Sequence, residues 1–211
     1  MKIVMIGMQG CGKGTQAQKI SRKYNIPHIS TGDMFREAMS KETPMGLIAK
    51  EYVNNGKLVP DEITTNLVRE RISQPDCVNG FILDGYPRNL SQLQDYYKDN
   101  SFDYAVFMDV DEEVVINRIK SRRTCEKCGK VYSTQTYSAP TCECGGNLIV
   151  REDEKALDER IRIYKEQTFP LISFFEEKGV LARIDVKNLK ETEPEKQIEE
   201  VFNKITNILG E

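Results

Sequence analysis

Short runs of apolar and β-branched residues alternate along the chain with longer segments in which apolar residues recur at helical spacing. The short runs predict strands at residues 2–6, 27–29, 80–83, 105–109 and 181–184. The longer segments predict helices at residues 15–24, 62–73, 89–98, 111–120, 158–178 and 194–209. This alternation of strands and helices favours an α/β fold, with a parallel sheet covered by helices on both faces.

Two stretches interrupt the alternation. Residues 31–59 are helical in period but polar, and they separate the second predicted strand from a long predicted helix. Residues 124–150 contain four cysteines together with Gly, Pro, Tyr, Ser and Thr. That composition is typical of a small module inserted in a chain. We therefore expect two insertions on an α/β body.

Length and charge narrow the class of protein. A chain of 211 residues allows one domain with small additions. The 30 basic and 33 acidic residues give a formal net charge of −3, which argues against a nucleic acid as the main partner. No apolar stretch approaches the roughly 20 residues that span a bilayer, and the N-terminal run is too short for a signal peptide. We expect a cytoplasmic monomer with no membrane or nucleic acid partner.

Residue usage limits the chemistry further. In a reducing compartment the six cysteines do not suggest three disulfides. The only histidine, His28, excludes His-based triads and sites with several histidines, and we expect its side chain to be packed. Lys, Arg, Asp and Cys remain as the residues able to carry chemistry. We expect Cys77, Tyr96 and Tyr97 to belong to the core.

A glycine-rich segment from Gly7 to Thr15 follows the first predicted strand and opens the first predicted helix. Glycines let successive backbone N–H groups turn toward phosphate oxygens, and the helix N-terminus favours negative charge. Lys13 is placed to bridge the β- and γ-phosphates, and Thr15 to reach Mg²⁺. Gly14 stands where the strict pattern has Ser or Thr, and the dinucleotide pattern fails because no third glycine follows three residues after Gly12. The segment predicts a phosphate-binding loop.

Polar segments also follow the second and third predicted strands, where parallel sheets present ligands. Residues 30–36 bind a ligand or form a helix cap, with Thr31 or Asp33 as the capping residue of a helix that starts near residue 34. After the third strand, Asp84 can hold Mg²⁺ through water, and Arg88 offers a planar fork for a phosphate.

A group of basic residues lies further along the chain, at Arg118, Arg122, Arg123, Arg151 and Arg162. On a shared helix, residues 118 and 122 would face the same way, and two like charges so close are mildly destabilising. An anionic ligand would explain their placement. Alternatively, Arg162 and Arg123 pair with neighbouring acidic side chains.

The cysteine-rich module has the composition of a tetrahedral thiolate site. Cys125 and Cys128 are separated by two residues and followed by a glycine, whereas only Glu143 separates Cys142 from Cys144. Four thiolates leave no open position for catalysis, so we expect a structural zinc that replaces a core in so short a segment. Disulfides and an iron site are the alternatives.

Taken together, these motifs resemble adenylate kinase in their order and spacing, over essentially the whole chain. The matching segments are Gly10-Cys11-Gly12-Lys13-Gly14-Thr15, Ser30-Thr31-Gly32-Asp33, Lys57-Leu58-Val59-Pro60, Asp84-Gly85-Tyr86-Pro87-Arg88 and Arg122-Arg123. The resemblance implies a P-loop NTPase core at residues 1–29, 60–121 and 163–211. It also implies a helical AMP-binding insertion at residues 30–59 and a zinc-bearing lid at residues 122–162.

The activity implied by the resemblance is Mg²⁺-dependent transfer, ATP + AMP ⇌ 2 ADP, a transferase reaction of nucleotide biosynthesis. The implied catalytic residues are Lys13, Asp84, Arg88, Arg118, Arg122, Arg151 and Arg162. For ATP the resemblance implies residues 10–15 with Arg122, Val131, Tyr132 and Lys196. For AMP it implies Thr31, Arg36, Lys57, Leu58, Val59, Gly85, Tyr86, Pro87, Arg88, Gln92, Arg151 and Arg162. The implied zinc ligands are Cys125, Cys128, Cys142 and Cys144.

Some positions depart from the family pattern. Gln9 replaces the usual Pro and Cys11 the usual Ala, and neither change removes a backbone donor. The second cysteine pair is one residue shorter than in metal-bearing lids of the family. A kinase for UMP or CMP, a GTP-dependent AMP kinase and a zinc-ribbon module that binds nucleic acid are the competing interpretations.

Overall fold

The computed structural model describes residues 1–190 and 192–210. Its central sheet has strand order β2-β3-β1-β4-β8, and all four strand pairings are parallel. The strands are β1 (Lys2–Ile6), β2 (His28–Ser30), β3 (Phe81–Asp84), β4 (Tyr104–Asp109) and β8 (Leu181–Asp185). The predicted α/β fold and its five strands are thus confirmed.

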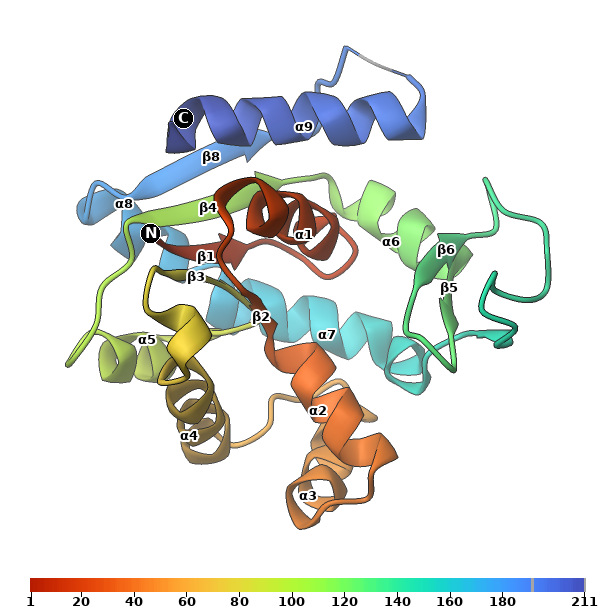
Figure 1. Cartoon of the computed structure of the whole chain (residues 1–211), viewed down its shortest axis with the longest axis horizontal. Coiled ribbons are helices and arrows are strands. Elements are labelled where there is room, and N and C mark those ends of the chain that lie inside the picture. The colour runs from red at the N-terminus through yellow and green to blue at the C-terminus, as the bar shows by residue number, and fades with distance from the viewer. Residues whose placement is uncertain (191, 211) are drawn as a thin grey trace.

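Helices cover both faces of the sheet (Figure 1). One face packs against α1 (Lys13–Tyr24), α6 (Glu112–Ser121) and α9 (Pro194–Leu209). The other packs against α4 (Asp61–Ile72), α5 (Leu90–Tyr96) and α8 (Leu171–Glu177). Alternate side chains of β1 supply the two cores, which is why this strand reads as a continuous apolar run. Cys77 and Tyr96 are buried as predicted, and Tyr97 is half-buried.

The first insertion projects from this body (Figure 1) and contains α2 (Thr31–Ser40) and α3 (Pro44–Val53). It has a small core of its own, formed by Phe35, Ala49 and Val59. The cap of α2 differs from the prediction. Ser30, and not Thr31 or Asp33, is the capping residue, because its hydroxyl accepts the Asp33 N–H at 3.2 Å.

The second insertion is a three-stranded antiparallel sheet in the order β6-β5-β7, reached directly from α6. Its strands are β5 (Arg122–Cys125), β6 (Val131–Ser133) and β7 (Leu148–Ile149). The helix predicted for residues 111–120 is present as α6, but Arg122 has the extended backbone of β5, so residues 118 and 122 do not face the same way on one helix. The helix ends there because the chain turns into the strand pairing of the inserted module.

The chain returns to the core through a 3₁₀ turn (Glu152–Ala156), α7 (Leu157–Ile163) and a π-helical turn (Tyr164–Thr168). The single helix predicted for residues 158–178 is therefore divided. Pro170 explains the division, because proline has no N–H to continue the ladder of helical hydrogen bonds. Among the described helices none is long and apolar enough to cross a membrane.

Candidate active site

The glycine-rich loop joins β1 to α1 and supports the side chain of Lys13. Gly10 and Gly12 have φ angles of 81° and 104°, a region that favours glycine, and Gly12 is the N-terminal cap of α1. The Lys13 ammonium donates to the backbone oxygens of Gly7 and Met8, at 2.7 and 2.9 Å. A cation is thus held over a turn at a helix N-terminus, the arrangement that binds phosphate.

Asp84 ends β3 beside this loop. Its Oδ2 lies 3.5 Å from His28 Nε2, and a Cβ placed on Gly14 would lie 3.7 Å from the same oxygen. Burial favours the neutral carboxyl, but the His28 interaction and the charges of Lys13 and Arg88 outweigh it and lower the pKa of Asp84. The ionised carboxylate next to Lys13 has the chemistry needed to hold Mg²⁺ through water.

A pocket opens beyond the C-terminal ends of β2 and β3. It is lined by Thr31, Gly32, Phe35, Arg36, Val53, Gly56, Lys57, Leu58, Val59, Thr64, Gly85, Arg88, Gln92 and Arg160. Most residues that sequence analysis assigned to AMP lie in it. Sequence analysis missed the apolar lining from Phe35 and Val53, which is formed only when α2 and α3 pack together.

Polar contacts fix the floor of the pocket. Thr31 Oγ1 and Arg88 Nε both donate to the backbone oxygen of Gly85, at 2.9 and 2.8 Å. The side chain of Gln92 accepts the Arg88 N–H at 2.8 Å and donates to Asp61 at 2.8 Å. Gly85 has a φ of 87°, and a Cβ there would lie 2.7 Å from Thr31 Oγ1, so a side chain would be strained and crowded. The geometry positions Arg88 rigidly.

A second cation of the pocket, Arg36, forms an ion pair with Asp33 at 2.6 Å on the same helix. Burial opposes ionisation of Asp33, but Arg36, Ser30 and the nearby charge of Arg151 lower its pKa. Asp33 of the first insertion and Arg151 of the inserted module therefore face each other with opposite charges at this point.

Four predicted AMP residues do not line the pocket: Tyr86, Pro87, Arg151 and Arg162. Tyr86 is only 1% exposed, and its hydroxyl contacts Thr65 and donates to the backbone oxygen of Gln92. Its ring packs in the core beside α5, and Pro87 is also absent from the lining. The side chain of Tyr86 therefore packs in the core, and the neighbouring Gly85 lines the pocket.

Arg162, which sequence analysis placed in the site, is not among the described residues that line the pocket. Its guanidinium pairs with Glu159 and Glu166, at 2.8 and 2.6 Å, and its side chain is 54% exposed. Arg160 lines the pocket instead. Residues two apart on a helix differ in direction by roughly 200°, so only one of the two can face the cleft. Spacing from the buried Tyr164, four residues after Arg160, is the signal that could have placed Arg160 in the lining.

Arg122 and Arg151 are anchored within the inserted module, and Arg118 of α6 lies close to the glycine-rich loop. Arg122 donates to Glu154 at 2.6 Å, and Arg151 donates to Thr124 Oγ1 at 2.9 Å. Arg118 reaches the backbone oxygen of Cys11 at 3.4 Å, beside the phosphate-binding loop. The alternative that Arg162 pairs with acids is confirmed, whereas Arg123 donates to backbone oxygens.

The residues predicted near the ATP base are dispersed. Val131 is 51% exposed on β6, and the Tyr132 hydroxyl contacts Cys142. Lys196 lies exposed on α9 and pairs with Glu193 at 3.2 Å. The structure therefore does not bring Lys196 together with the phosphate-binding loop through a side-chain contact in the described residues.

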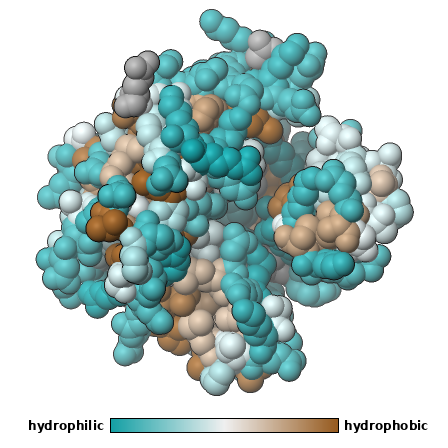
Figure 2. Space-filling model, in the orientation of Figure 1, coloured by the Kyte–Doolittle hydropathy of each residue, from teal (hydrophilic) through white to brown (hydrophobic). Residues whose placement is uncertain are grey.

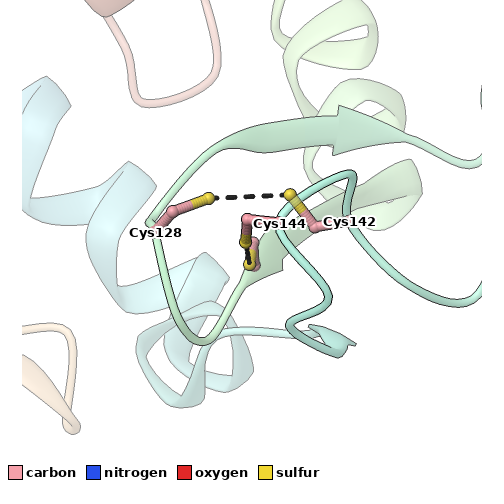
Figure 3. Close-up of side chains that lie close together, drawn as sticks. Cys128, Cys142 and Cys144 are labelled. Atoms are coloured by element: carbon pink, nitrogen blue, oxygen red, sulfur yellow. Dashed lines mark hydrogen bonds between the residues drawn. The ribbon is translucent and has the colours of Figure 1, made fainter.

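The four cysteines of the module converge, and Figure 3 shows the sulfurs of Cys128 and Cys142 turned toward each other, with Cys144 beside them. All four sulfurs lie within 4.8 Å of one another, and two pairs are separated by 3.5 and 3.6 Å. Zinc bound tetrahedrally at about 2.3 Å needs sulfurs about 3.8 Å apart, whereas a disulfide needs about 2.05 Å. The ligand set fits a structural zinc, and the short Cys142–Cys144 spacing does not prevent convergence.

Figure 2 shows the surface hollowed between the inserted module, at the right of the view, and the rest of the molecule. The phosphate-binding loop, Asp84 and the lined pocket follow one another along the C-terminal edge of the sheet.

Comparison with known proteins agrees with this geometry. The family model described as adenylate kinase matches residues 5–180. An adenylate kinase of Fervidobacterium nodosum is 45% identical, over 100% of this chain and 98% of its own length. Adenylate kinases of Clostridium beijerinckii and Clostridium perfringens are each 43% identical, over 100% of this chain and 99% of their own. The chain belongs to the adenylate kinase family.

Proposed function

We propose that this protein transfers a phosphoryl group reversibly between ATP and AMP, ATP + AMP ⇌ 2 ADP. The observation that carries the proposal is the position of residues 84 and 85. Asp84 faces the phosphate-binding loop through Gly14, and Gly85 lines the neighbouring pocket. Because residues 84 and 85 are adjacent, a donor phosphate on the loop and an acceptor phosphate in the pocket would lie close together. Direct transfer between the two phosphates requires this proximity.

On the donor side, the loop from Gly10 to Thr15 binds the ATP phosphates through its backbone N–H groups. Lys13 offsets the charge of the transferring phosphoryl group, and Arg118 lies beside the loop at Cys11. Mg²⁺, held through water near Asp84 and bound to ATP, would neutralise phosphate charge in the transition state.

On the acceptor side, Arg36 and Arg88 bind the AMP phosphate, and Arg160 takes the role that sequence analysis gave to Arg162. Thr31, Gln92 and the segment from Lys57 to Val59 contact the nucleoside. Arginine suits these positions because it stays charged and binds two phosphate oxygens at once. No covalent intermediate is needed, so alignment and charge compensation supply the catalysis.

Two insertions would close over the substrates. We assign residues 30–59 to an AMP-binding arm, residues 122–162 to a lid, and residues 1–29, 60–121 and 163–211 to the core. The lid carries Arg122 and Arg151, and its closure would bring them to the phosphates and exclude water that could accept the phosphoryl group. Structural zinc at the four cysteines would make the lid a rigid body.

The test is a phosphoryl-transfer assay over a matrix of donors and acceptors. We expect ATP with AMP to give the highest kcat/KM. Faster transfer to UMP or CMP would overturn the assignment of the acceptor, and a preference for GTP would overturn the assignment of the donor. RNA binding without phosphoryl transfer would favour the zinc-ribbon interpretation.

We also propose that the protein acts as a cytoplasmic monomer. None of the six cysteines forms a disulfide, which suits a reducing compartment. Size-exclusion chromatography with light scattering tests the oligomeric state, and a dimer would overturn it.

A further inference from the structure

The metal site of the lid has a contact from outside its two cysteine loops. The hydroxyl of Tyr132, on β6, lies 3.1 Å from the sulfur of Cys142. The resemblance to the family places this tyrosine beside the ATP base, but in the structure its hydroxyl faces a metal ligand. Figure 3 shows where the Cys142 sulfur lies, turned toward Cys128.

The two cysteine pairs differ in what their own backbones can donate. Two residues lie between Cys125 and Cys128, whereas only Glu143 lies between Cys142 and Cys144. Thiolates bound to metal are stabilised by hydrogen bonds from their surroundings, and the short loop after a first cysteine supplies backbone N–H donors. The second pair has one such donor fewer. A phenolic O–H is a donor that can take its place.

Neighbouring contacts fix the Tyr132 ring. The ring lies 4.4 Å from that of Tyr137, whose hydroxyl donates to the backbone oxygen of Thr141 at 2.9 Å. On Lys130, the ammonium lies 5.2 Å from the Tyr132 ring centre and pairs with Glu143 at 2.8 Å. The side chains that contact the Tyr132 ring are thus bound in turn to the residues on both sides of Cys142. These contacts hold the Tyr132 hydroxyl beside the Cys142 sulfur.

We propose that Tyr132 is a positioning residue of the metal site, and that its hydroxyl donates to the Cys142 thiolate in place of the backbone N–H that the shortened pair lacks. The proposal rests on the cysteine site and is independent of which nucleotides the protein uses. Its failure would therefore leave the proposed phosphoryl transfer untouched.

The test is zinc affinity, measured by competition with a chromogenic chelator on the full-length protein. Tyr132→Phe removes the hydroxyl and keeps the ring, and we expect it to weaken zinc binding by about 10- to 100-fold, as for other partners of metal ligands. Tyr137→Phe is the matched control, because its hydroxyl contacts a backbone oxygen and no sulfur. We expect the control to stay within about threefold of the wild type. Equal losses in both variants, or none in Tyr132→Phe, would overturn the proposal.

A spectroscopic measurement separates hydrogen bonding to sulfur from a general loosening of the lid. In the cobalt-substituted protein, loss of a hydrogen bond to a thiolate makes the sulfur a better electron donor. We expect the thiolate-to-cobalt charge-transfer band of Tyr132→Phe to move to longer wavelength, and that of Tyr137→Phe to stay in place. Bands that coincide in the wild type and Tyr132→Phe would contradict a bond between this hydroxyl and Cys142.

Discussion

The Nε atom of Arg122 donates a hydrogen bond to Oε1 of Glu154 across 2.6 Å, and the two side chains are only 16% and 4% exposed. The bond joins β5 to the 3₁₀ turn on the other side of the inserted sheet. An arginine with five N–H donors keeps its orientation when one donor is fixed in this way. Glu154 therefore orients Arg122 for the phosphates that the lid is proposed to cover.

We expect Glu154→Gln to lower kcat by about tenfold, because replacing a charged acceptor with a neutral one weakens the bond by about 1–2 kcal/mol. Glu159→Gln is the control, since its partner Arg162 is exposed and surface ion pairs contribute little. Steady-state kinetics on both variants provide the measurement. A wild-type kcat in Glu154→Gln would show that Arg122 needs no such orientation.

Arg160 and Arg162 offer a second comparison within one helix. Lysine keeps the charge but cannot bind two phosphate oxygens in one plane. We expect Arg160→Lys to lower kcat/KM by about 100-fold or more, as for other arginines that stabilise transferring phosphoryl groups. Arg162→Lys should remain within about twofold, because exposed ion pairs of this kind contribute little. The reverse ranking would restore the assignment that sequence analysis made.

Features encoded locally could be predicted from the sequence. The strands were recognisable because they are buried on both faces and read as apolar runs, and the phosphate-binding loop because its glycines and Lys13 are contiguous. The cysteine site was recognisable because thiolates at such spacings have few other uses in a reducing compartment.

Features that depend on distant pairing or helix phase could not be predicted. Arg122 and Glu154 are 32 residues apart in sequence and meet only after the lid has folded. The choice between Arg160 and Arg162 depends on which face of α7 continues into the buried Tyr164. The position of Tyr86 could not be predicted either. This residue belongs to the motif beside the cleft, but its side chain packs in the core.

The pKa of Asp84 leads to a prediction about pH. It lies below the ordinary value of 3.8, because the His28 contact and the Lys13 charge overcome burial. A carboxyl with a lowered pKa stabilises the fold above that ordinary value, and this contribution is lost as pH falls through the lowered pKa. We expect His28→Leu to raise the pKa of Asp84 and to move the acid limb of the kcat–pH profile to higher pH.

His28→Gln is the control for this effect, because its amide keeps a hydrogen-bond donor near Asp84. We expect its acid limb to lie closer to that of the wild type. The profiles would be measured with saturating substrates, alongside acid unfolding of each variant. Coincident acid limbs in the wild type and His28→Leu would mean that Asp84 titration does not limit the reaction.

Removal of the metal should affect the lid and leave the AMP pocket intact. None of the described apolar clusters includes a residue between 126 and 150, and the one lid residue that lines the pocket, Arg160, lies outside that range on α7. A lid without its zinc therefore loses its main source of stability. We expect one zinc per chain, faster proteolysis of residues 126–150 after chelation, and a Kd for AMP within about twofold of the zinc-loaded protein, since little binding free energy is lost.

Cys77→Ala is the control for thiol chemistry, because Cys77 is buried beside Arg71 and outside the lid. Its metal content and its proteolysis pattern should match those of the wild type. Elemental analysis, limited proteolysis and calorimetric titration with AMP provide the measurements. Loss of AMP binding together with the metal would show that the pocket depends on the lid.

Two glycines with nearly equal φ angles allow the effect of backbone strain to be distinguished from the effect of contact between the arm and the lid. Gly56 has a φ of 71°, and a Cβ there would lie 2.8 Å from the backbone oxygen of Ala156 and 2.9 Å from Arg160 Cγ. Gly179 has a φ of 69°, but in the described part of the chain a Cβ there meets no atom within 4 Å.

Alanine at either position costs about 1–2 kcal/mol of backbone strain, and only Gly56→Ala also displaces the base of the lid and Arg160. We expect both variants to lose similar stability in urea unfolding, but only Gly56→Ala to raise the KM for AMP by about tenfold, equivalent to about 1.4 kcal/mol. An equal KM in the two variants would show that close contact between Gly56 and the lid is not needed for AMP binding.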